Sequence, residues 1–129
     1  MEDVKVKISI LWIFKALASL TFTIIMFMEE GVLAGIMAGE LLGMQIGPEI
    51  LLLGTIESWV PLVMAVLSIN LEYRANRWAN IIAGIVFTAL GLISLIDAFS
   101  AHGILMWVSA AVATALIAWL ALKWPEQKV

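Results

Sequence analysis

The sequence predicts an all-α membrane protein, a four-helix transmembrane bundle. Hydrophobic residues make up 64% of the 129 residues and charged residues only 13%, whereas soluble domains average about 25% charged residues. Four apolar segments, at residues 8–28, 50–69, 78–96 and 104–122, match the length of about 20 residues that a helix needs to cross a bilayer. These spans leave room only for short connections, so we expect a single transmembrane domain over residues 1–129.

The first span, residues 8–28, is apolar except for one lysine and a few hydroxyl side chains. Trp12, Lys15, Ser19 and Thr23 recur at i, i+3, i+7 and i+11, which places them on one face of a helix. A polar stripe of this kind faces other helices more favourably than lipid. The apolar core is longer than that of a signal peptide, so we expect the chain to retain this span.

The next segment, residues 31–47, is apolar but carries glycine at every fourth position. The glycines are Gly31, Gly35, Gly39, Gly43 and Gly47. On a helix this series forms a ridge of small residues that permits close packing. We therefore expect an additional short apolar segment on the outer side. It is either a helix on the membrane surface or a re-entrant segment that acts as a lid or lines a pore.

The second span, residues 50–69, contains one charged side chain, Glu57, and a proline four residues later. Ionisable residues inside a membrane are costly and mark functional sites. Pro61 frees the carbonyl of Glu57 and kinks the helix, which suits a water-filled cavity that opens outward. Glu57 is thus a candidate proton or cation site or ligand anchor. The alternative is a carboxyl group that only bonds neighbouring helices.

Lys15 is the other charged residue within the predicted spans. It lies seven residues from the inner end of the first span, and Glu57 lies seven from the outer end of the second, which leaves about 10 Å between their levels. Helical side chains lean toward their own N-terminus, so the two side chains should lean apart. We expect no direct salt bridge, although a water-mediated link stays open. Lys15 can instead extend to the headgroups on its own side.

The third and fourth spans, residues 78–96 and 104–122, each carry a face of small and polar side chains that suits close helix packing. These residues are Asn80, Gly84, Gly91 and Ser94 in one span, and Ala110, Thr114, Ala118 and Ala121 in the other. Asn80 is expected to form a hydrogen bond to another helix.

Positive charge outside the spans is confined to one side of the predicted bundle. The residues are Lys5, Lys7, Arg74, Arg77, Lys123 and Lys128. Segments 29–49 and 97–103 contain no lysine or arginine, and cytoplasmic loops are the ones enriched in these residues. Both termini are therefore predicted to be cytoplasmic. Arg74 and Arg77, flanked by Tyr73 and Trp78, are expected to contact lipid headgroups.

The candidate site for an ion or ligand comprises Glu57, Lys15, Ser19 and Asn80. The leading interpretation is a small transporter or channel-like protein. The alternative is a non-catalytic accessory subunit that binds a lipid or quinone. An enzyme is the least expected class, because the sequence contains no nucleophile and base pattern. The sequence indicates no cofactor, metal site or nucleic-acid partner, and four short spans that expose glycine and alanine faces favour a homo-oligomer.

The layout also resembles small, uncharacterised prokaryotic four-helix membrane proteins that are broadly DoxX-like. The similar features are the acid of the second span followed by Pro61, the string RANRWAN from Arg74 to Asn80, and the Lys-Trp-Pro tail. The resemblance implies a prokaryotic inner (plasma) membrane location and a redox-associated or accessory role. It transfers no catalytic residue.

Overall fold

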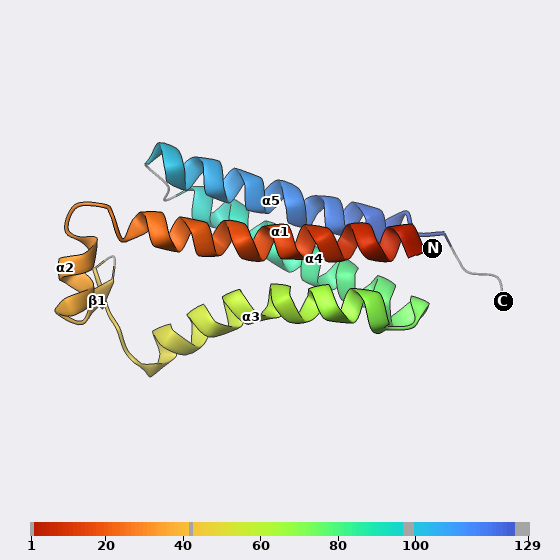
Figure 1. Ribbon diagram of the computed structural model, residues 1–129, viewed down its shortest axis with the longest axis horizontal. Helices are drawn as coiled ribbons and strands as arrows, with labels where there is room; N and C mark the ends of the chain where they lie inside the picture. The colour runs from red at the N-terminus through yellow and green to blue at the C-terminus, as the bar shows by residue number, and fades with distance from the viewer. Residues whose placement is uncertain (1, 42, 97–99, 126–129) are drawn as a thin grey trace.

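The computed structural model describes residues 2–41, 43–96 and 100–125, which form four long helices and a small additional unit at one end (Figure 1). The elements are α1 (Glu2–Met26), α2 (Val32–Met37), β1 (Glu40–Leu41), β2 (Met44–Gln45), α3 (Pro48–Asn70), α4 (Tyr73–Ile96) and α5 (Ala101–Leu122). Helices α1, α3, α4 and α5 are each long and apolar enough to cross a membrane. The prediction of four such helices is confirmed.

Two of the long helices begin well before the predicted spans. Helix α1 begins at Glu2 rather than at residue 8, and α4 begins at Tyr73 rather than at residue 78. The predicted boundaries covered only the uninterrupted apolar cores, whereas a helix continues through polar turns as long as its backbone hydrogen bonds are made.

The beginning of α1, the end of α5 and the α3–α4 connection lie at one end of the bundle, referred to below as the end with the chain termini, and α2 and β1 lie at the other (Figure 1). Arg74 and Arg77, in the first two turns of α4, therefore lie at the same end as the beginning of α1. The other end carries Glu29, Glu30 and Glu40 in the segment that joins α1 to α3. The basic and the acidic connections of the sequence therefore lie at opposite ends of the bundle.

Helices α4 and α5 pack closely through small residues, of which the sequence analysis had singled out Gly84, Gly91 and Ala118. A Cβ atom added to Gly84 would lie 3.0 Å from Cβ of Ala118, and one added to Gly91 would lie 3.4 Å from Cβ of Ala111. The prediction of close approach is confirmed. Because these faces are buried inside one chain, however, they do not supply the exposed faces on which the expectation of a homo-oligomer partly rested.

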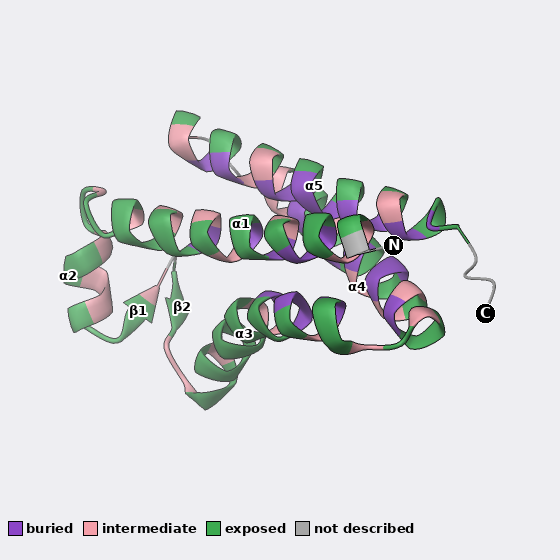
Figure 2. Ribbon diagram, turned by 45° about the vertical axis from the view of Figure 1, so that its right-hand side comes forward, coloured by how far each residue is buried: buried purple, intermediate pink, exposed green. Residues whose placement is uncertain are grey.

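Helix α3 packs unevenly along its length. Its buried residues are Pro61, Met64, Ala65 and Ser68, all in the half nearer α4 (Figure 2). No residue from Pro48 to Val60 is buried. Pro61 lies between the two halves, where it removes the hydrogen bond to the carbonyl of Glu57. The half of α3 on the side of α2 is therefore held by fewer packing interactions than the rest of the bundle.

The glycine-rich segment is not one continuous helix. Gly31, Gly39 and Gly43 have φ angles of 81°, 87° and 79°, which L-residues with side chains rarely adopt. They allow the turns around the six-residue α2 and the antiparallel pair β1–β2, in which Glu40 pairs with Gln45. The predicted ridge of small residues is therefore wrong, because these glycines serve the backbone turns. A short helical element is present, and its place relative to the membrane stays a prediction.

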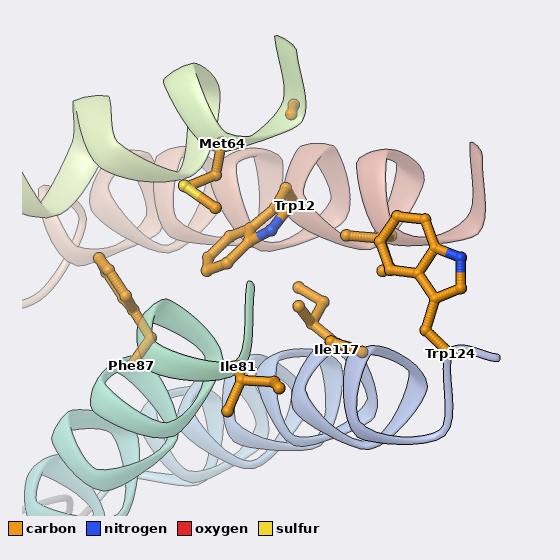
Figure 3. Packing of buried hydrophobic residues seen from close by; sticks show 9 residues of the cluster. Trp12, Met64, Ile81, Phe87, Ile117 and Trp124 are labelled. Carbon is orange, nitrogen blue, oxygen red and sulfur yellow. The ribbon is translucent and has the colours of Figure 1, made fainter. Parts of the chain in front are cut away.

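The apolar core lies toward the end that carries the chain termini. Trp12 and Ile8 of α1 are fully buried, and they join a cluster with Met64, Ile81 and Ile117 from the other three long helices (Figure 3). This cluster holds the four helices together at one end. It fixes the position of α1 relative to the half of α3 that follows Pro61.

Candidate functional site

Lys15 of α1 and Glu57 of α3 form a direct ion pair. The Lys15 side chain is 2% exposed and that of Glu57 is 36% exposed. The Lys15 ammonium group also donates a hydrogen bond of 3.1 Å to Oγ of Ser19. The expectation that these two charges would not meet is wrong, as is the alternative that Lys15 extends to the headgroups.

Lys15 and Glu57 meet because they lie at similar heights in their helices. Because α1 begins at Glu2 and ends at Met26, Lys15 lies about 16 Å from its outer end at 1.5 Å per residue. Glu57 lies nine residues after Pro48, the first residue of α3, or about 14 Å from the outer end. The two residues are therefore at similar heights, and the long lysine side chain spans the remaining separation.

Phe87 of α4 completes the surroundings of the lysine. The Lys15 Nζ atom lies 4.9 Å from the centre of its ring, a geometry in which the ring face attracts a cation. The indole ring of Trp12 packs against Phe87 edge-on, with ring centres 5.7 Å apart. The sequence analysis missed Phe87. Its position on the same face as Asn80, Gly84 and Gly91 was the available signal.

A cavity of about 150 Å³ adjoins the ion pair. Its lining residues are Lys15, Glu57, Phe87, Leu90, Gly91, Ser94, Trp107 and Ala110, so that all four long helices contribute. One water molecule occupies about 30 Å³ in the liquid, so this space suits a few waters or a small ion. Most of the wall is apolar, and the two charged groups are its strongest polar features.

Asn80 belongs to a separate polar layer on the side of the chain termini. Its Oδ1 atom accepts hydrogen bonds from Nε1 of Trp12 at 2.7 Å and from Oγ of Ser68 at 3.2 Å. Its Nδ2 atom donates to Oδ1 of Asn76 at 2.7 Å, and Nδ2 of Asn76 donates to the carbonyl of Ser68 at 2.7 Å. The predicted hydrogen bond from Asn80 to another helix is confirmed.

The four residues named from the sequence thus divide into two neighbouring groups. Lys15, Ser19 and Glu57 lie together, whereas Asn80 lies in the layer formed with Trp12, Ser68 and Asn76. Buried polar groups are stable in an apolar interior only when they are hydrogen-bonded, and the amides of this layer have such partners. Trp12, Ser68, Asn76 and Asn80 of this layer are all fully buried. The sequence analysis did not identify Ser68 or Asn76.

A second polar contact between distant segments lies at the opposite end of the bundle. Nε2 of His102, at the beginning of α5, contacts the carboxylate of Glu29, which follows α1. The ring of Phe22 lies 6.1 Å from that of His102. Within the described ranges, His, Cys, Asp and Glu side chains form no group of three that could hold a metal ion. Asp97 lies outside those ranges.

Four long apolar helices with an ion pair between two of them fit the class of small multi-pass membrane proteins. The whole chain, residues 1–129, matches the family described as "Family of unknown function (DUF6326)", and the protein belongs to that family. Comparison with curated proteins and with solved structures gave no match.

Proposed function

We propose that this protein is a small membrane transporter in which the transported ion binds Glu57 and weakens the Lys15–Glu57 pair. The observation that carries the proposal is an ion pair on the wall of a cavity at mid-height of helices long enough to cross a membrane. Charged groups at this depth are costly in hydrocarbon. Their presence on a cavity wall is more typical of an ion pathway than of a purely structural contact.

The chemistry of the pair suggests how it responds to an ion. A proton or small cation that binds the Glu57 carboxylate competes with Lys15 for the same negative charge. Once the carboxylate is neutralised, the attraction between α1 and α3 weakens at this height. Lys15 then keeps its hydrogen bond to Ser19 and its contact with the ring of Phe87, which hold its position while the partner is occupied.

The part of the protein that moves in this proposal is the outer half of α3, because it is packed less tightly than the other half. The half of α3 from Pro48 to Val60 has no buried residue, and Pro61 interrupts the hydrogen bonding at the boundary with the packed half. The layer around Asn80 blocks passage toward the end with the termini. Transport therefore requires the outer half of α3 and the Asn80 layer to open in turn.

Reconstitution into liposomes tests the proposal. An imposed pH gradient should drive proton uptake that is followed with an internal pH-sensitive dye, and Glu57→Gln should abolish it. Glu49→Gln is the matched control, because Glu49 lies in the first turn of the same helix and is exposed. Equal uptake by Glu57→Gln and the unsubstituted protein contradicts the proposal. Absence of proton and cation flux under any gradient favours the second candidate.

The second candidate is an accessory subunit that binds a lipid or quinone. An apolar groove of about 370 Å³ between α1 and α5 favours it. Phe14, Leu17 and Leu105 are among its lining residues, and His102, which contacts Glu29, also lines it. The resemblance to DoxX-like proteins is consistent with this role and stays a hypothesis. A native mass spectrum that retains a lipid or quinone would support it.

The orientation and assembly of the protein are part of the same proposal. We place both termini in the cytoplasm, on the strength of the lysine and arginine residues at one end, and we place the bundle in a prokaryotic plasma membrane, as the DoxX-like resemblance implies. A homo-oligomer is proposed because four helices enclose little interior. Light scattering of the detergent-solubilised protein tests the oligomeric state, and a cysteine accessibility scan of the connections tests the orientation.

A further inference from the structure

A second cavity, of about 450 Å³, lies at the end of the bundle that carries the chain termini. Its lining residues are Tyr73, Arg74, Arg77, Trp78 and Trp124. Two guanidinium groups and three aromatic side chains therefore surround a single space between the beginning of α4 and the residues that follow α5. This cavity is separate from the one beside Glu57, and the proposed transport function makes no use of it.

Arg77 is held in place by the end of α5. Its Nε atom donates a hydrogen bond of 3.0 Å to the carbonyl of Ala121, and its Nη2 atom donates one of 3.2 Å to the carbonyl of Leu122. These bonds leave Nη1 outside the interaction with α5. A guanidinium group fixed in this way loses little further conformational freedom when it binds an anion, because its orientation is already set.

Arg74 lies one helical turn before Arg77 and is exposed. Residues three apart on a helix are neighbours, so the two guanidinium groups face the same side of α4. Planar guanidinium groups bind phosphate oxygens through paired hydrogen bonds. Two such groups at the N-terminal end of a helix, where backbone N–H groups also favour negative charge, are chemically suited to one phosphate.

Two aromatic side chains of the cavity, Tyr73 and Trp124, also hold each other in place. The hydroxyl of Tyr73 donates a hydrogen bond of 3.1 Å to the carbonyl of Trp124, and the two rings meet edge to face with centres 5.5 Å apart. Trp124 is 4% exposed, and its Nε1 atom has no hydrogen-bond partner among the described residues. Figure 3 shows that nitrogen on the side of the ring turned away from Ile117 and Trp12.

We propose that this cavity binds the phosphate of an anionic phospholipid, with Arg74 and Arg77 as the anion-binding residues. Its position favours a lipid over a soluble anion. Trp78 is 57% exposed beside Arg77 at the end of an apolar helix, where tryptophan is typical of the boundary between hydrocarbon and headgroups. Basic pockets between transmembrane helices bind acidic headgroups. The acyl chains would then lie along the exposed apolar faces of α4 and α5.

Native mass spectrometry of the full chain in detergent tests this site. The probes are phosphatidylglycerol and phosphatidylcholine with identical acyl chains, and inorganic phosphate as a competitor. We expect tighter binding of phosphatidylglycerol, and a loss of about fivefold in its affinity in Arg74→Gln, as expected for one basic residue near an acidic headgroup. Arg74→Lys should lose less, because it keeps the charge.

Lys7→Gln is the matched control, because Lys7 is also exposed, near the beginning of α1, and its replacement removes the same charge. Its affinity for phosphatidylglycerol should be unchanged. Equal losses in Lys7→Gln and Arg74→Gln, or equal affinities for the two lipids, would overturn the site. Displacement of phosphatidylglycerol by millimolar inorganic phosphate would overturn its assignment to a lipid. Melting temperatures of the variants without lipid verify that each one is folded.

Discussion

The ammonium group of Lys15 and the carboxylate of Glu57 neutralise each other across the α1–α3 interface. Among the described residues, each is the other's only ionic partner. The pair is also asymmetric, since the lysine is almost fully buried and the acid is partly open. The acid is therefore the member that an incoming ion can reach, and the lysine is the member that depends on the pair for its charge balance.

Replacement of Glu57 by leucine should destabilise the protein by about 3 kcal/mol, the lower end of the range for breaking a buried pair. The reason is that Lys15, which is only 2% exposed, is left without a counter-charge. The double variant Lys15→Met with Glu57→Leu should lose less than the sum of the two single changes, because it leaves no unpaired charge. Unfolding with a denaturing detergent, followed by circular dichroism, measures all three. Strict additivity would contradict a direct interaction.

Trp12→Phe should destabilise the protein by about 1–2 kcal/mol, because it removes the hydrogen bond from Nε1 to Asn80 in a buried layer. Trp59→Phe is the matched control, since Trp59 is 60% exposed and should tolerate the change. The same unfolding measurement compares them. Equal effects of the two substitutions would argue against the Asn80 layer as a stabilising element.

Gly84→Ala should push α4 away from α5 and cost about 1–3 kcal/mol, the usual range for overpacking. The added Cβ atom would lie 3.0 Å from the backbone nitrogen of Ala118 and 3.0 Å from the carbonyl oxygen of Thr114. Gly54→Ala introduces the same atom where nothing lies within 4 Å and should leave stability unchanged or slightly higher. A neutral Gly84→Ala variant would contradict the close packing of these helices.

Gly39→Ala should loosen the turn that precedes β1, because a residue with a side chain at φ 87° costs about 1–3 kcal/mol. Gly39→Asn should be tolerated better, since asparagine adopts left-handed conformations more readily than alanine. Hydrogen exchange of residues 40–46 reports the local effect. Identical exchange in the two variants would show that this turn does not need a positive φ angle.

The number and order of the long helices could be predicted because apolar length alone decides whether a segment can cross a bilayer. The close packing of α4 and α5 could also be predicted, because small residues such as Gly84 and Ala118 leave room for backbone contact. The cross-helix hydrogen bond of Asn80 followed from the cost of leaving a buried amide without a partner.

The Lys15–Glu57 contact could not be predicted in the same way, because it depends on where the outer ends of α1 and α3 lie. Helix α1 ends at Met26 rather than at residue 28, and α3 begins at Pro48 rather than at residue 50. Together these differences correspond to about 6 Å along the helices, which is enough for the long lysine side chain to turn a predicted gap into contact. The ridge predicted from the glycine spacing was wrong for a different reason. A four-residue period is compatible both with a ridge on one helix and with a succession of tight turns.

The ion pair inside the bundle is the central claim, and solid-state NMR in lipid bilayers tests it most directly. Protein labelled with ¹⁵N at lysine Nζ and ¹³C at glutamate Cδ should show a dipolar coupling that corresponds to ion-pair contact, within about 4 Å. The coupling should vanish in Glu57→Gln and persist in Glu49→Gln. Absence of the coupling in the unsubstituted protein, or its persistence in Glu57→Gln, would contradict the pair and the transport function proposed from it.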